Sequence, residues 1–96
     1  MYTNKQLKEL KEIQTMNVIK GNNLSCICME EIGEFITAFN KYRMGEVTKD
    51  EILSEGVDVM NTMYNLLNFT FDNISVNKMI DEKIKKAKKV LEMGVH

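Results

Sequence analysis

The segment from Ile52 to Phe71 places the strongest constraint on the fold, because it is apolar around more than half of its circumference when wound as a helix. A helix of this kind must be covered on several sides. The whole chain has 96 residues, which is little material for such a cover, and self-association is the natural supplement. The sequence therefore predicts helices packed around this segment, in an assembly that further copies of the chain complete.

Apolar residues recur at helical spacing along the rest of the chain as well, and no proline interrupts them. The spacing and the capping signals predict helices over about residues 7–21, 23–43, 48–71 and 76–93. No linker or internal repeat divides the chain. The predicted fold class is therefore all-α, with about four helices in an antiparallel bundle and a single domain over residues 1–96.

The formal net charge of −1 argues against a dedicated nucleic-acid or membrane-surface binder, because a basic patch would dominate the total charge of either class. No run reaches the length of a membrane span, and residues 1–5 lack the apolar core of a signal peptide. Cys26 and Cys28 are expected to be small buried hydrophobic residues in a reducing compartment. Together these features predict a cytoplasmic protein without membrane or nucleic-acid partners.

Two acidic clusters interrupt the apolar sequence, where a carboxylate is costly unless a positive charge compensates it. The first is Glu30, Glu31 and Glu34, and the second is Glu55 and Asp58. Glu31 and Glu34 share one face of their helix, and so do Glu55 and Asp58. Antiparallel packing of the two helices would bring these four carboxylates together with no protein cation beside them. The arrangement predicts a site for a divalent metal ion.

Oxygen donors alone, without a nearby histidine or cysteine, favour a hard cation, Mg²⁺ or Mn²⁺. The only histidine is His96, and the Glu-x-x-His motif of di-iron bundles is absent. Magnesium usually combines carboxylates with substrate phosphates, so hydrolysis of a phosphate ester or anhydride is the matching reaction. Glu30 is then the candidate to accept a proton from the attacking water, directly or through a second metal ion. The alternative interpretation is that both clusters are solvated surface.

Two further sets of polar residues border the predicted site. Asn61, Asn65 and Asn68 continue a narrow polar stripe that begins at Asp58, and we expect them either to line a cleft or to bond between helices. The last helix carries a basic face, which would supply positive charge for phosphates or would simply be solvated and complement the helix dipole. Its members are Lys83, Lys85, Lys86, Lys88 and Lys89.

On its two acidic clusters the chain resembles the MazG-like superfamily of all-α NTP pyrophosphatases, which carry E-E-x-x-E and E-x-x-D on two antiparallel helices. The likeness covers residues 24–67 well and the final helix loosely. It implies a homodimer or homotetramer that hydrolyses a (deoxy)nucleoside triphosphate to the monophosphate and pyrophosphate, for clean-up of the nucleotide pool. The implied ligands of Mg²⁺ are Glu31, Glu34, Glu55 and Asp58, and the implied catalytic residues are Glu30 and Glu31.

The resemblance also implies how substrate is bound. Relatives contact phosphates through a lysine of the last helix, matched by Lys83, and a later arginine, which Lys86 or Lys89 would replace here. Relatives commonly line the nucleobase pocket with the first helix and the start of the second. The residues nominated for that pocket are Asn17, Asn22, Asn23 and Tyr2.

Two other functions compete with this interpretation. The first is a phosphoribosyl-ATP pyrophosphatase-like enzyme, which uses similar carboxylates. The second is a non-catalytic helical module that binds a partner through its apolar helix and its lysine face.

Overall fold

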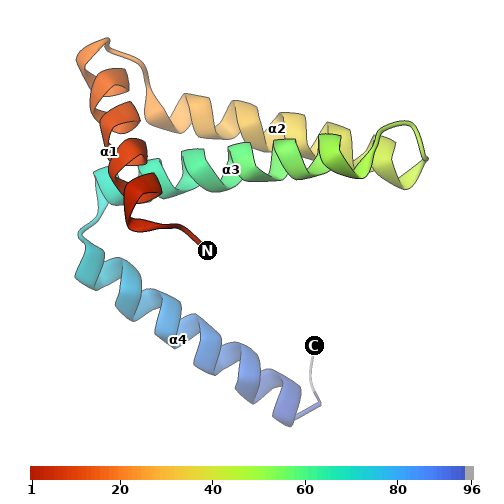
Figure 1. The fold of residues 1–96 in the computed structure, drawn as a ribbon. Coiled ribbons are helices and arrows are strands. Elements are labelled where there is room, and N and C mark those ends of the chain that lie inside the picture. The colour runs from red at the N-terminus through yellow and green to blue at the C-terminus, as the bar shows by residue number, and fades with distance from the viewer. Residues whose placement is uncertain (95–96) are drawn as a thin grey trace. The chain divides into compact units, whose positions relative to one another are not determined.

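The computed structural model describes residues 1–94 and consists of four α-helices joined by short loops (Figure 1). Val95 and His96, the latter the chain's only histidine, lie outside the described residues. The helices are α1 (Asn4–Ile19), α2 (Leu24–Arg43), α3 (Lys49–Thr70) and α4 (Asn73–Glu92). No strand occurs between residues 1 and 94, so the predicted all-α class is confirmed.

Side-chain caps explain where the helices begin. The residues before α1, α2, α3 and α4 are Thr3, Asn23, Thr48 and Asp72, and each accepts a backbone N–H of the first turn. The predicted capping box of Thr48 and Glu51 is present, with the Thr48 N–H donating to Glu51 Oε2 at 2.7 Å. A second box at Thr3 starts α1 three residues earlier than the apolar spacing predicts.

The chain forms two compact units, Met1–Leu66 and the part from Leu67 onward, and α3 contributes to both. Each unit is a helical assembly of its own. The predicted four-helix antiparallel bundle and its completion by further copies stay predictions.

In the first unit, α2 and α3 run antiparallel and side by side (Figure 1). Two contacts between them mark the register. The Cys28 thiol lies 4.0 Å from the Met63 thioether, and a Cβ atom added at Gly56 would lie 3.4 Å from the Phe35 ring. A methyl group at position 56 would therefore just reach van der Waals contact with the Phe35 ring, and any larger side chain would meet it.

Helix α1 is tied to this pair by a small core and one buried hydrogen bond. Leu10, Leu24 and Cys28 are its buried hydrophobic residues. The prediction of a buried cysteine is confirmed for Cys28 and wrong for Cys26, which is exposed. Gln14 is only 2 % exposed, and its Nε2 donates to the backbone oxygen of Asn65 at 2.7 Å. Because a buried amide is costly without a partner, this bond specifies which turn of α1 faces α3.

The second unit consists of the end of α3, the short loop after it and α4. Leu67 and Phe71 from its first part and Val76, Met79 and Ile80 from α4 line an apolar hollow of about 580 Å³. No residue of α4 is fully buried. None of the helices in residues 1–94 combines the length and the apolarity that a membrane span requires.

Candidate metal centre

Three carboxylates from α2 and α3 meet where the two helices run side by side. Glu31 and Glu34 come from α2 and Glu55 from α3, and each offers an oxygen that lies within 4.8 Å of the other two. Helical spacing explains the first two, and the antiparallel register of the pair brings in the third. We call these three residues the carboxylate trio. The two acidic clusters of the sequence therefore do converge.

The trio contains two buried oxygen atoms that no group of the described chain satisfies. These atoms are Oε2 of Glu31 and Oε2 of Glu55, and neither accepts a hydrogen bond within residues 1–94. An ionised oxygen removed from water without a donor or a cation is one of the costliest arrangements in a protein. An ionised carboxylate can only accept hydrogen bonds, so these two oxygens need a hydrogen-bond donor or a cation.

Electrostatics at Glu31 point the same way. Burial raises the pKa of the Glu31 carboxyl, and the negative charges of Glu34, Asp58 and Glu55 raise it further. No cation offsets this concentration of charge: the one ion pair within the described residues joins Lys5 and Glu9 on α1. Asp58 is exposed and stands outside the trio, although its charge reaches Glu31.

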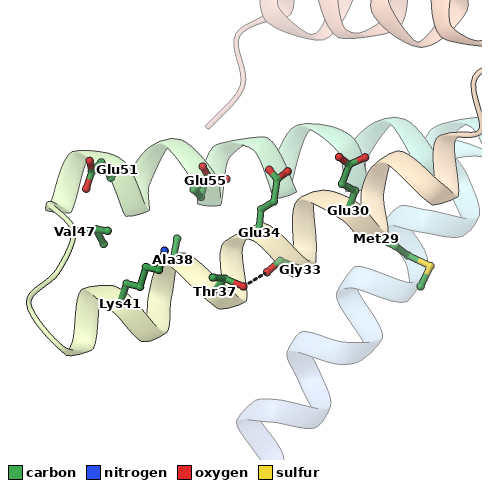
Figure 2. Close-up of a pocket in the computed structure, with 10 residues that line it drawn as sticks. All are labelled: Met29, Glu30, Gly33, Glu34, Thr37, Ala38, Lys41, Val47, Glu51 and Glu55. Carbon is green, nitrogen blue, oxygen red and sulfur yellow. Dashed lines mark hydrogen bonds between the residues drawn. The ribbon is translucent and has the colours of Figure 1, made fainter.

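An open hollow of about 700 Å³ adjoins the trio (Figure 2). Glu30 lines it together with Glu34 and Glu55, and its side chain projects from α2 one turn away from Glu34. The exposed Glu30 carboxylate therefore lies beside the trio without being part of it. The other residues that line the hollow are Met29, Gly33, Thr37, Ala38, Lys41, Val47 and Glu51.

None of these seven lining residues is among the site residues predicted from the sequence, and two of them, Lys41 and Glu51, are charged. Lys41 is the only basic residue of the hollow, and it lies seven positions after Glu34, which places it on the same face of α2. The seven-residue spacing from Glu34 could have identified Lys41 from the sequence. Glu51 lies four residues before Glu55 on α3 and also lines the hollow. The sequence pattern assigns Glu51 only to the capping box.

A second, smaller hollow of about 110 Å³ lies among α1, α2 and α3. The structure brings Asn61 and Asn65 to its wall, together with Asn17 from α1. Asn61 Oδ1 also accepts a hydrogen bond from the Tyr2 hydroxyl at 2.8 Å. Asn61 therefore both lines a hollow and bonds to another segment, whereas Asn65 lines the hollow and Asn68 is not among its lining residues. The remaining lining residues are Leu10, Ile13, Leu24, Ile27 and Thr62.

Lys83 and Lys86 belong to α4 and are exposed. Within their own unit they line a shallow apolar hollow with Ala87, Val90 and Leu91. Contact of either lysine with a substrate phosphate stays a prediction.

Comparison with models of protein families, with curated proteins and with solved structures gives no match for this chain. The candidate site is therefore judged on its own geometry and charge.

Proposed function

We propose that this protein is a metal-dependent nucleotide pyrophosphohydrolase, which converts a (deoxy)nucleoside triphosphate to the monophosphate and pyrophosphate. The observation that supports it best is the pair of buried, unsatisfied oxygens of Glu31 and Glu55 inside a trio of carboxylates. Such a group is unfavourable in a protein that holds no ion, and it suits one that does.

The donors present fit magnesium. All three are carboxylates, and Glu31, Glu34 and Glu55 would hold the ion, with Asp58 proposed as a further ligand. Mn²⁺ suits the same donors. A bound Mg²⁺ would offset the negative charge that develops on the phosphate oxygens during hydrolysis.

Side chains of the open hollow would perform the remaining tasks. Glu30 is exposed beside the trio, where its carboxylate would accept the proton of the water that attacks phosphorus, as the bond to the leaving group breaks. Lys41, on the same wall, would hold phosphate oxygens by charge. Lys83 and Lys86 are proposed for the phosphate tail as well. We infer a role in clean-up of the nucleotide pool, by a cytoplasmic homodimer or homotetramer.

We propose the smaller hollow as the place of the nucleotide's base. On α2, Ile27 of the hollow precedes Glu31 of the trio by four residues, and on α3 Asn61 follows Asp58 by three. One helical turn advances about 5.4 Å, so a ring in this hollow would lie about one turn from Glu31 of the trio and from the exposed Asp58, and nearly two turns from Glu55. That spacing suits one ligand that reaches both places.

The test is release of pyrophosphate from a panel of dNTPs and NTPs, with and without Mg²⁺ or Mn²⁺. Glu31→Gln and Glu55→Gln keep the shape of the side chain and remove its charge, and each should lower turnover by roughly 10²–10³-fold. Glu9→Gln is the matched control, since Glu9 is an exposed glutamate on α1 far from the trio in sequence. Undiminished turnover in both trio variants would end the proposal, and phosphoribosyl-ATP in the panel tests the competing enzyme.

A non-catalytic interaction module is the second candidate, because the hollow on α4 leaves a large apolar surface uncovered by its own unit. It predicts that Mg²⁺ together with a non-hydrolysable nucleotide leaves the melting temperature unchanged. A hydrolase should instead be stabilised by that pair of ligands through binding linkage.

A further inference from the structure

Helix α4 carries an apolar stripe that its own unit leaves open. The members of this α4 stripe follow one another at spacings of four, three and four residues and so share one face of the helix: Ile80, Ile84, Ala87 and Leu91. Ile80 is 50 % exposed, Ile84 51 % and Leu91 64 %. The two apolar hollows of this unit meet on the stripe, because both are lined by Lys83 and Ala87. The stripe is therefore one continuous surface, about 17 Å long at 1.5 Å per residue.

The two sides of the α4 stripe differ in charge. Asp81 and Lys88 lie seven residues apart along one side, and both are exposed. Lys83 and Val90, also seven residues apart, lie along the other side. A seven-residue repeat is that of paired helices, in which the apolar stripe forms the core and the residues beside it face the partner helix. These four flanking residues therefore decide which helix can lie on the stripe, and in which direction.

An antiparallel second copy of α4 matches these flanking residues. In an antiparallel pair each side of the stripe faces the same side of the partner, so Asp81 of each copy meets Lys88 of the other. Lys83 then lies against Val90 of the second copy, where its methylene stem can pack while its ammonium group stays in water. A parallel pair would instead set Lys83 of each copy against Lys88 of the other, which is repulsive. Charge complementarity therefore favours the antiparallel direction.

The apolar residues agree with the same register. Ile80 lies opposite Leu91 of the second copy, and Ile84 lies opposite Ala87, so every member of the stripe meets another member. The C-terminal half of one α4 then lies over the apolar hollow of about 580 Å³ in the other copy, where Phe71 forms part of the wall. One contact thus covers the stripe and the hollow beside it.

We propose that two copies of this chain associate through an antiparallel pair of α4 helices, in which the two α4 stripes pack together and Asp81 of each copy pairs with Lys88 of the other. The contact is isologous, because each copy supplies the same residues, and it closes on itself. The inference rests on the self-association included in the proposed function, but not on hydrolysis. An acidic helix or an anionic lipid surface would suit the lysines of α4, but Asp81 beside the stripe opposes both.

Sedimentation equilibrium of the full chain at micromolar concentration, with three charge variants, tests this inference. Lys88→Asp turns both ion pairs into repulsions and should raise the dissociation constant of the contact about tenfold. The double variant Asp81→Lys/Lys88→Asp restores opposite charges and should return the constant to its natural value. Lys89→Asp is the matched control, because it makes the same change of charge one residue later, on the face opposite the stripe. It should leave the dissociation constant within about twofold.

A variant within the stripe tests the apolar part of the contact. Ile84→Glu places a charge at the centre of the stripe and should halve the mass of the assembly, with helical content by circular dichroism unchanged. A natural protein that is monomeric throughout overturns the inference, and so does a monomer that binds vesicles of phosphatidylglycerol instead.

Two further outcomes would contradict the antiparallel pair. A contact that Lys88→Asp tightens is parallel, and an assembly that neither Lys88→Asp nor Ile84→Glu weakens uses another surface. Release of pyrophosphate reports separately on the proposed function. An assembly that responds to the variants as expected but hydrolyses no nucleotide overturns that function and leaves the α4 contact in place.

Discussion

Glu31→Gln should stabilise the protein in the absence of metal, because it removes one negative charge from the crowded carboxylate trio. Two unit charges at the 4.8 Å limit of the trio repel by about 1 kcal/mol even under water-like screening. Glu31 has two such neighbours, Glu34 and Glu55, and no cation offsets them. Removing its charge should therefore raise the free energy of unfolding by about 1–2 kcal/mol at neutral pH in EDTA. For a chain of this size the melting temperature should rise by about 4–16 °C.

In the presence of Mg²⁺, the natural protein should instead be more stable than the Glu31→Gln variant. An ion present at a hundredfold excess over its dissociation constant adds about 2.7 kcal/mol to the natural protein and much less to a variant that lacks one ligand. Thermal melts followed by circular dichroism, with EDTA and with Mg²⁺, measure both effects. The exposed pair of Glu9 and Lys5 is the control, since Glu9→Gln should change stability by less than about 0.5 kcal/mol in either buffer. A Glu31→Gln variant that is less stable than the natural protein in EDTA would refute the reasoning.

The effect of Glu31→Gln on stability should also depend on pH. The folded-state pKa of Glu31 is raised, so folding favours its protonated form, and this group's contribution to stability is fully present only below its unfolded pKa of about 4.3. The contribution is lost as pH rises through the folded pKa. The stability advantage of Glu31→Gln in EDTA should therefore grow between acidic and neutral pH, and it should be smallest at the acidic end. A constant difference across that range would contradict the assigned cause.

Three other outcomes follow from the fold. Gly33→Leu should be tolerated, since a Cβ at Gly33 meets nothing within 4 Å, whereas Gly56→Leu should cost about 1–3 kcal/mol in denaturant unfolding because its side chain enters the Phe35 ring. Hydrogen bonds from the Ser75 N–H and hydroxyl lower the pKa of Asp72. Its contribution to stability is therefore present above the unfolded pKa and is lost as pH falls through the folded pKa. In Asp72→Asn the melting temperature should accordingly depend less on pH in the acidic range. Sedimentation at micromolar concentration should show a dimer or larger species, and a stable monomer would contradict the burial argument for the third helix.

Local signals predicted the helices well. The capping box at Thr48 and the polar break at Asp72 each consist of residues that are close together in the sequence. The observed helix bounds lie within three residues of the predicted ones. The start of α1 was missed because Gln6 completes its box with Thr3 before any apolar residue appears.

The site was predicted less completely, because its composition depends on the register between two helices. Spacing alone placed Asp58 with Glu55, but in the folded chain Glu55 meets Glu31 and Glu34 while Asp58 remains exposed outside the trio. The turn of α3 that faces α2 is decided by tertiary contacts such as Phe35 against Gly56, which no local pattern reveals. The buried Gln14, which fixes α1, was missed for the same reason.

Gly56 follows Glu55 directly in the chain, and the ring that occupies the space above it, Phe35, follows Glu34. The contact between Gly56 and Phe35 therefore adjoins the carboxylate trio in sequence on both helices. A bulkier residue would act as a wedge, dilute the local density of negative charge and weaken the grip on any dication. A side chain larger than a methyl group at position 56 would therefore be felt at the carboxylates as well as at the Phe35 ring.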